Sequence, residues 1–206
     1  QMLGAFCVGS FIVIWLSSLM APVFLIMSLL RGYYIVTAFI SIITAIAYLP
    51  WSKGPILKKV QTFYAQCHPY YYKGMKVMYE GESLPSPDGP QTFYAIHPHG
   101  AFCIGWSNLF SSPLLDHVKF CFSPALYTSP FFRLFSRCVG NPGSASRSAM
   151  ISYFKNGLDL ALPPGGFEEA TLTSMTQDRV FIKKRTGFIK LCLQYGVAVR
   201  PVYVFG

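Results

Sequence analysis

The stretch TGFIKLCLQYGVAVRPVYVF (residues 186–205) holds a helix pattern followed directly by a strand pattern. Its first half repeats apolar residues at helical spacing, at Phe188, Leu191, Cys192 and Tyr195. Gly196 then supplies a helix stop, and 197–205 is a strongly apolar run typical of a strand. The stretch therefore predicts one helix–strand unit of an α/β domain.

The same alternation continues towards the N-terminus. Residues 158–162 predict a strand that runs into a Pro-Pro-Gly-Gly turn, and 144–156 predict a helix that ends at Gly157. QTFYAI (91–96) predicts a further strand, and MKVMYEG (75–81) another. Strands that alternate with helices favour an α/β fold with a mostly parallel sheet and flanking helices, in which ligands bind at the carboxyl ends of the strands.

The N-terminal quarter has a different character. Residues 2–30 carry no charge, and neither do 33–50, with Arg31 between the two runs. Because a spanning helix needs about 20 apolar residues, we expect residues 1–52 to form a transmembrane hairpin. Its first run could be one tilted helix with a kink at Pro22, or a helix followed by an interfacial turn. Residues 53–206 then form a second domain. Two buried core helices, or a secretory signal, are the alternative interpretations.

Charge supports this division and suggests an orientation. The lysines that follow the second run place the C-terminal part in the cytosol by the positive-inside rule: Lys53, Lys58 and Lys59. Only 12% of the 206 residues are charged, about half of what a soluble domain carries, and the net charge is +9. This composition suits anionic headgroups or an anionic ligand, and it disfavours a nucleic-acid partner. The chain begins at Gln1 and stops within an apolar run, so we expect a fragment.

The first candidate site is the HPHG sequence at the end of the predicted strand 91–96. His97 and His99 would share a face on an extended backbone, and imidazole can accept a proton from an alcohol near neutral pH. Gly100 permits close approach to a ligand. A plain turn with two structural histidines is the alternative. The six cysteines lack metal-site spacing, so no metal is expected.

Two further segments carry candidate residues. Gly165 and Gly166 follow a predicted strand, so their N–H groups could face an anion or an oxyanion, and one of the two following glutamates could orient a histidine. Residues 183–185 (KKR) precede the helix beginning near Gly187, a combination that suits phosphate groups. An ordinary turn and a solvated basic face are the alternatives. No G-x-S-x-G elbow is present, which favours activation of a substrate hydroxyl over a covalent intermediate.

Four blocks in order give the chain a family resemblance: FYAIHPHGAFCIG, VGNPGSASRSAM, LALPPGGFEEATL and KKRTGFIKLCLQYGVAVRPVYVFG. Together they resemble the type-2 diacylglycerol acyltransferase family, which includes monoacylglycerol and wax-alcohol acyltransferases. Thr186 departs from the lysine of many members, and Pro164 before the glycines is found in only part of the family. The family's stretch after the final FG is absent.

The resemblance implies a glycerolipid-acyltransferase-like fold, C-terminally truncated here. It implies acyl transfer from acyl-CoA, the co-substrate, to diacylglycerol, with triacylglycerol formed at the endoplasmic reticulum and lipid droplets and no cofactor. His99 would be the general base, His97 would shape the turn or share the proton transfer, and Glu169 would orient His99. Substrate contacts would come from the other matched positions: Gly100, Ser146, Arg147, Gly165, Gly166, Lys184, Arg185 and Gly187.

Other functions stay open at this point. The acceptor could be monoacylglycerol or a wax alcohol. A serine lipid hydrolase would need an exposed nucleophile, for which Ser107 and Ser146 are the candidates. A non-enzymatic membrane protein could use its basic half to bind anionic lipid.

Overall fold

The computed structural model describes residues 1–72, 74–80, 86–174, 176–177 and 179–205. At its centre is a five-stranded sheet with strand order β3-β2-β4-β1-β5, in which every pairing is parallel. The strands are β1 (Thr92–His97), β2 (Lys119–Phe122), β3 (Pro142–Ser144), β4 (Leu160–Leu162) and β5 (Ala198–Tyr203). The predicted α/β fold with a parallel sheet is confirmed.

Strand β1, which carries the first candidate site at its end, is enclosed on both sides. It pairs with β4 on one side, with Phe93 opposite Leu160, and with β5 on the other, with His97 opposite Tyr203. All its residues are buried. A parallel strand covered on both faces needs a near-continuous apolar run, which the sequence TFYAI provides.

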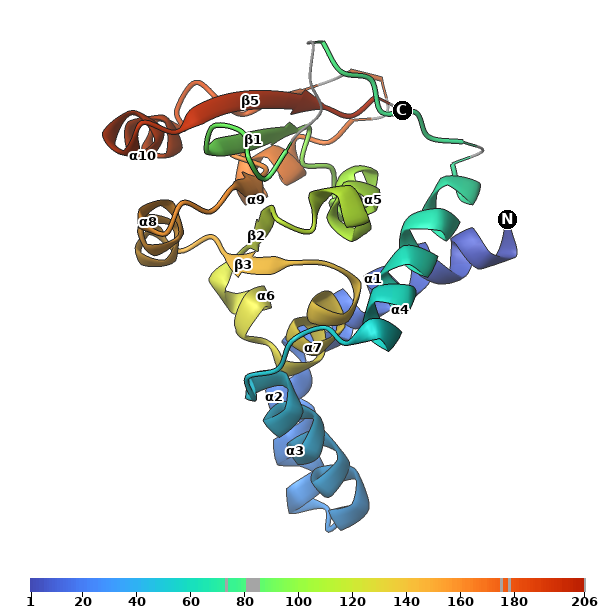
Figure 1. Cartoon of the computed structure of the whole chain (residues 1–206). Helices are drawn as coiled ribbons and strands as arrows, with labels where there is room; N and C mark the ends of the chain where they lie inside the picture. The colour runs from blue at the N-terminus through green and yellow to red at the C-terminus, as the bar shows by residue number, and fades with distance from the viewer. Residues whose placement is uncertain (73, 81–85, 175, 178, 206) are drawn as a thin grey trace.

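Helices cover both faces of the sheet (Figure 1). On one face α4 (Pro55–Cys67), α5 (Ile104–Ser111) and α7 (Pro130–Val139) enclose an aromatic core with Trp106, Phe110, Phe120 and Phe132. On the other, α8 (Arg147–Lys155) and α10 (Gly187–Tyr195) bury Met150, Phe154, Leu191 and Cys192. The remaining short helices are α6 (Pro124–Thr128), α9 (Gly166–Thr171), η1 (His68–Tyr70) and η2 (Pro113–Leu115).

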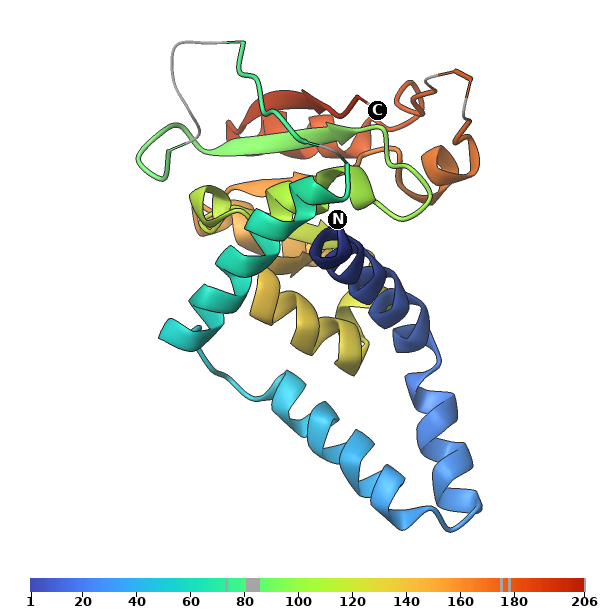
Figure 2. The ribbon, with the colours of Figure 1, turned by 90° about the vertical axis from the view of Figure 1, so that its right-hand side faces the viewer.

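The N-terminal quarter forms a helical hairpin that projects from the domain (Figure 2). Helices α1 (Met2–Leu19) and α2 (Ala21–Leu30) form one arm, α3 (Tyr34–Tyr48) forms the other, and the first arm breaks at Met20, just before Pro22. Within the described residues only α1 is long and apolar enough to cross a membrane, since α2 has 10 residues and α3 has 15. The expected pair of spans is therefore not confirmed.

The start of the hairpin is packed into the domain. Phe11 of α1 lies against Phe132 and Phe135 of α7, with ring centroids 6.0 Å apart in both pairs. The Ser129 hydroxyl donates to the carbonyl of Ser18 over 2.5 Å. The projecting arms, in contrast, expose many large apolar side chains, among them Val23, Phe24, Ile26, Leu29, Ile35, Phe39 and Ile42. An apolar surface of this kind is typical of contact with lipid or with another protein.

Most predicted elements of the C-terminal half are present. The strands predicted over 91–96, 158–162 and 197–205 correspond to β1, β4 and β5, and the two predicted helices correspond to α8 and α10. Gly157 and Gly196 follow these helices with left-handed backbones, at φ +69° and +66°, as helix stops require. The strand predicted over 75–81 is wrong for 75–80, which have no regular structure, and residue 81 lies outside the described residues.

Candidate functional site

The topology brings two of the sequence-predicted segments together. Strands β1 and β4 are neighbours, and after β1 the chain continues to α5 on one face, whereas after β4 it continues through α9 to α10 on the other. Neighbouring strands whose connections leave to opposite faces open a crevice at their carboxyl ends. The HPHG turn after β1 and the Pro-Gly-Gly turn after β4 both lie at this point.

Glu169 of α9 is the residue that joins these segments. Its buried carboxylate accepts hydrogen bonds from the backbone N–H of His99 over 2.6 Å and of Phe181 over 2.8 Å. Both carboxylate oxygens lie 3.2 Å from Nδ1 of His97. Burying a carboxylate costs free energy unless such donors satisfy it. These partners therefore stabilise Glu169 in its buried position. We call His97, His99 and Glu169 the His–Glu cluster.

The glycine pair allows Glu169 to approach the histidines. A Cβ added to Gly165 would lie 2.5 Å from Cβ of Glu169, which no real side chain could tolerate. Gly166 has φ +58°, a left-handed conformation that favours glycine. Its N–H donates to the carbonyl of Pro163 over 3.1 Å, so that group already has an acceptor within the turn, and the expected oxyanion role of the glycine pair stays a prediction.

The pairing of the carboxylate differs from our expectation. It contacts the ring of His97, whereas it reaches His99 through the backbone N–H. The reason is local: the strand ends at His97 and the backbone turns at once, with Gly100 at φ +64°, so the two rings acquire different partners instead of sharing a face. The His97 ring is 8% exposed, and its Nε2 has no hydrogen-bond partner among the described residues.

The ring of His99 is half-buried and held by its own turn. Its Nδ1 lies 2.6 Å from the carbonyl oxygen of Gly100, and because a carbonyl can only accept, this contact selects the tautomer of the neutral ring in which Nδ1 carries the proton and Nε2 the lone pair. The Sγ of Cys103 lies 3.3 Å from Nε2. Burial raises the pKa of the Cys103 thiol well above its usual range, so Cys103 stays a neutral thiol.

The basic segment lies next to the Pro-Gly-Gly turn. Arg185 donates to the carbonyl of Gly165 over 3.3 Å and forms an ion pair with Glu168. Lys184 is exposed, and Gly187 begins α10. Of the two cations expected to bind phosphate, Lys184 is open to solvent, whereas Arg185 also ties the turn together.

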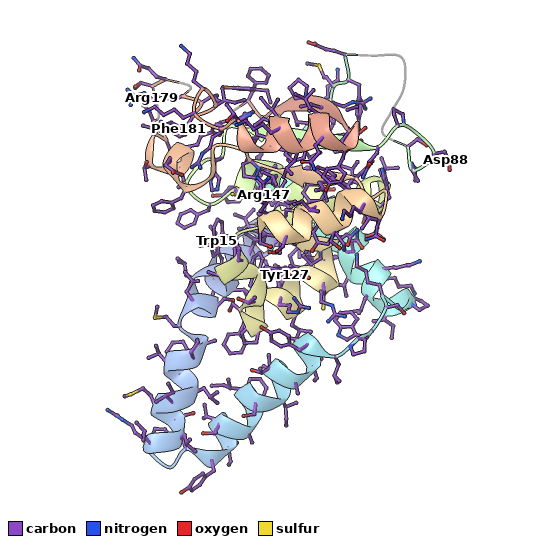
Figure 3. The ribbon with its side chains drawn as sticks, turned by 90° about the vertical axis from the view of Figure 1, so that its left-hand side faces the viewer. Trp15, Asp88, Tyr127, Arg147, Arg179 and Phe181 are labelled. Atoms are coloured by element: carbon purple, nitrogen blue, oxygen red, sulfur yellow. The ribbon has the colours of Figure 1, made fainter. Side chains whose placement is uncertain are left out.

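Ser146 and Arg147 lie apart from the His–Glu cluster. The Ser146 hydroxyl accepts from the N–H of Ala149 over 3.3 Å and so caps α8. These residues follow β3, and both β2 and β4 stand between β3 and β1. Figure 3 shows Arg147 at the start of α8, below the loop that carries Phe181. Their expected substrate contacts remain a prediction.

Sequence patterns did not indicate one buried pair, Ser107 and His68. The Ser107 hydroxyl lies 2.7 Å from Nε2 of His68, and both residues are 2% exposed. Burial lowers the pKa of His68. Within the described chain no carboxylate pairs with this ring, so the pair lacks the third member of a hydrolase triad. In the same described ranges no His, Cys, Asp and Glu side chains cluster as a metal site would require.

Fold and cluster together define an α/β protein with a histidine–carboxylate site at the carboxyl edge of a parallel sheet. The sequence model of the family described as "Diacylglycerol acyltransferase" matches residues 59–206, which is most of the chain and includes the whole site. The chain belongs to this diacylglycerol acyltransferase family.

Individual relatives agree with this assignment. The chain is 26% identical to "Diacylglycerol O-acyltransferase 1" of Eremothecium gossypii over 57% of this chain and 27% of that protein. It is 30% identical to "Diacylglycerol O-acyltransferase 2" of Danio rerio over 55% of this chain and 34% of that protein. It is 29% identical to "Acyl-CoA wax alcohol acyltransferase 2" of Homo sapiens over 53% of this chain and 36% of that protein. These matches span about a third of each relative's length. Comparison with solved structures gives no match.

Proposed function

We propose that this chain carries the acyl-transfer site of an acyl-CoA-dependent O-acyltransferase that places a fatty acyl group on the free hydroxyl of diacylglycerol. The observation that supports this most is the His–Glu cluster, because it joins two family blocks through a buried carboxylate at the crevice of the sheet. Such a site offers a basic nitrogen and no serine nucleophile. It therefore suits direct transfer to an alcohol.

The proposed base is His99. Its Nδ1–H is held by the Gly100 carbonyl, which leaves Nε2 as the basic nitrogen, and its ring is less enclosed than that of His97. In the first step Nε2 accepts the proton of the lipid hydroxyl while the hydroxyl oxygen attacks the thioester carbonyl. The tetrahedral intermediate then expels coenzyme A as a thiolate, which takes the proton from the imidazolium. No proton or electron is gained or lost overall.

His97 and Glu169 have a positioning role in this scheme. The carboxylate fixes the His97 ring and also holds the backbone N–H of His99, so it sets the shape of the turn that presents the base. The backbone N–H of Gly100 is the proposed oxyanion donor, since that of Gly166 already donates to Pro163. Lys184 is the proposed contact for coenzyme A phosphates, together with Arg185.

The proposed setting is the membrane of the endoplasmic reticulum, with the α/β domain on its cytosolic side and with lipid droplets as a second location. The apolar hairpin supports contact with the bilayer, because its exposed side chains would otherwise face water. Lys53, Lys58 and Lys59 at its end support the cytosolic orientation.

The test is an acceptor series. Membranes that contain the protein are incubated with labelled oleoyl-CoA and with diacylglycerol, monoacylglycerol or a fatty alcohol in turn. We expect labelled triacylglycerol with diacylglycerol as the best acceptor. Transfer only to another alcohol would reassign the acceptor, and no transfer to any of them would contradict the proposal. Labelling of the wild-type protein by a fluorophosphonate would instead indicate a serine hydrolase.

A further inference from the structure

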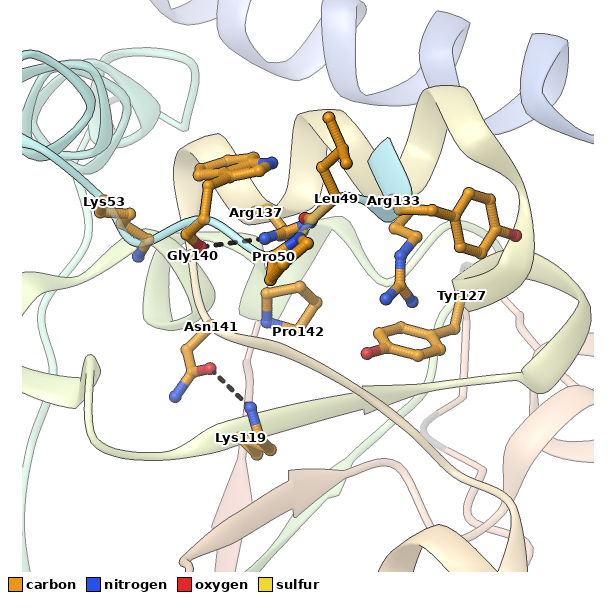
Figure 4. Close-up of a pocket in the computed structure, with 12 residues that line it drawn as sticks. Leu49, Pro50, Lys53, Lys119, Tyr127, Arg133, Arg137, Gly140, Asn141 and Pro142 are labelled. Atoms are coloured by element: carbon orange, nitrogen blue, oxygen red, sulfur yellow. Dashed lines mark hydrogen bonds between the residues drawn. The ribbon is translucent and has the colours of Figure 1, made fainter. Parts of the chain in front are cut away.

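A polar cavity lies away from the His–Glu cluster. This basic pocket, of about 460 Å³, is enclosed by the end of α3, helices α6 and α7, and the starts of β2 and β3, and is lined by Tyr48, Lys53, Lys119, Tyr127, Arg133 and Arg137, among others (Figure 4). Because the strands are parallel, their amino ends lie on one side of the sheet and their carboxyl ends on the other. The pocket lies at the amino ends of β2 and β3, and the His–Glu cluster lies at the carboxyl ends of β1 and β4. The pocket is therefore a separate site.

Arg137 anchors the end of the hairpin at this pocket. Its Nη1 donates to the carbonyls of Ala47 and Leu49 over 2.8 and 2.9 Å, and its Nη2 donates to that of Trp51 over 3.0 Å. The guanidinium also lies 4.0 Å from the centre of the Trp51 ring. The last carbonyls of a helix lack partners within it, so Arg137 caps α3 and holds it against α7.

Arg133 is held so that the two Nη atoms of its guanidinium, here called the Arg133 fork, face the cavity. The guanidinium lies 4.8 Å from the ring centre of Tyr48 and 4.6 Å from that of Tyr127, and its Nε donates to the Ala47 carbonyl over 3.0 Å. Its Nη atoms have no hydrogen-bond partner within the described chain. Figure 4 shows this end of Arg133 directed into the pocket beside Tyr127. A guanidinium fixed in this way is preorganised for a planar or tetrahedral oxyanion.

The charges of the pocket are not balanced. Lys53 pairs with Asp116 over 2.7 Å, but Lys119, Arg133 and Arg137 have no carboxylate partner among the residues that the structure describes. Burial lowers the pKa of Lys119, and repulsion from Lys53 and Arg137 adds to the shift. A half-enclosed group of cations without acidic partners is complementary to an anion.

We propose that the basic pocket binds the phosphate of an anionic membrane lipid. The pocket lies where the apolar hairpin joins the α/β domain. There Tyr48 and Trp51 follow the exposed apolar surface of α3, and aromatic residues are enriched at such positions at the headgroup level of a membrane. The Arg133 fork provides the geometry for phosphate oxygens, and Lys119 provides a second positive charge. This function is independent of acyl transfer, because it uses no residue of the His–Glu cluster.

The experiment titrates a short-chain phosphatidic acid into the protein in a neutral detergent and follows binding by calorimetry. The variants are Arg133→Gln and Lys119→Gln, and the matched control is Lys155→Gln, which removes the same charge from an exposed position on α8. We expect saturable binding that Arg133→Gln and Lys119→Gln each weaken by about ten- to hundredfold, whereas Lys155→Gln leaves it unchanged. A short-chain phosphatidylcholine, whose headgroup is neutral overall, should bind more weakly.

A second titration with coenzyme A identifies the source of the phosphate. If coenzyme A binding depends on Arg133 and Lys119 and phosphatidic acid binding does not, the pocket belongs to the thioester substrate and the lipid assignment is wrong. Equal phosphatidic acid binding by the wild type and both pocket variants would also overturn the proposal. Thermal unfolding of each variant establishes that it is folded, and Arg133→Lys, which keeps the charge and loses the fork, provides a milder change that should still weaken binding.

Discussion

The carboxylate of Glu169 lies 3.2 Å from Nδ1 of His97 and connects the helix after β4 to the end of β1. The same carboxylate accepts from the backbone of His99 and of Phe181, so one buried side chain organises three segments of the site. This contact links the HPHG turn to the helix that follows the Pro-Gly-Gly turn. It also makes the site sensitive to changes of single atoms.

Replacing the carboxylate by an amide should damage both fold and activity. In Glu169→Gln the amide NH₂ would face a backbone N–H, so we expect a loss of about 1–3 kcal/mol in the free energy of unfolding and a strong loss of acyl transfer. Thermal unfolding and the oleoyl-CoA assay measure the two effects. Glu80→Gln is the matched control, because Glu80 is exposed and lies in a different segment from the His–Glu cluster and the basic residues 183–185. Equal behaviour of the two variants would refute the organising role of Glu169.

Gly165 should not tolerate a methyl group. In Gly165→Ala the new Cβ would collide with Glu169 and push α9 away, so we expect a cost of about 1–3 kcal/mol and reduced transfer. Gly54→Ala serves as the control, since a Cβ there meets nothing within 4 Å. Denaturant unfolding of both variants measures the difference. If the Gly165→Ala variant were as stable as the Gly54→Ala variant, α9 would not be packed as described.

Lys184 should affect acyl-CoA binding more than the chemical step. Because this lysine is exposed and has no role in the turn, Lys184→Gln should raise KM for oleoyl-CoA several-fold and leave kcat almost unchanged, and the effect should shrink at high salt. Steady-state kinetics at two salt concentrations test this. A fall in kcat with unchanged KM would argue against the proposed phosphate contact.

Ser146 should contribute to stability as a helix cap. Its hydroxyl accepts from the Ala149 N–H at the start of α8, so Ser146→Ala should lower the free energy of unfolding by about 1 kcal/mol. Ser146→Asp keeps a capping acceptor and should restore most of the loss. If both variants are as stable as the wild type, the capping role is wrong.

The sequence predicted the parts of the fold whose patterns are long or clearly ended. Strands β1 and β5 are six-residue segments rich in apolar residues, and α8 and α10 end at glycines with left-handed backbones. Strand β3 could not be predicted, because Pro142–Ser144 has no strand propensity and joins the sheet only through its pairing with β2. Tertiary pairing of this kind leaves no local pattern.

The sequence predicted which residues form the candidate site, but it did not predict which side chains contact one another. The motifs pointed to His97, His99 and Glu169, and the structure brings them together. Which imidazole faces the carboxylate depends on how the chain turns after His97, and an extended strand was the wrong basis for that inference. The basic pocket could not be foreseen, because Lys53, Lys119 and Arg133 are far apart in the sequence and meet only in the folded domain.

The most direct test of the central claim compares acyl transfer from labelled oleoyl-CoA to diacylglycerol by the wild type, His99→Gln and His97→Gln, with folding checked by thermal unfolding. Loss of a general base costs about 10²–10⁴-fold in rate, so His99→Gln should lose at least this much while unfolding near the wild-type temperature. His97→Gln should lose activity together with stability, because it leaves the Glu169 carboxylate without its ring partner. Full activity of a folded His99→Gln protein would contradict the account.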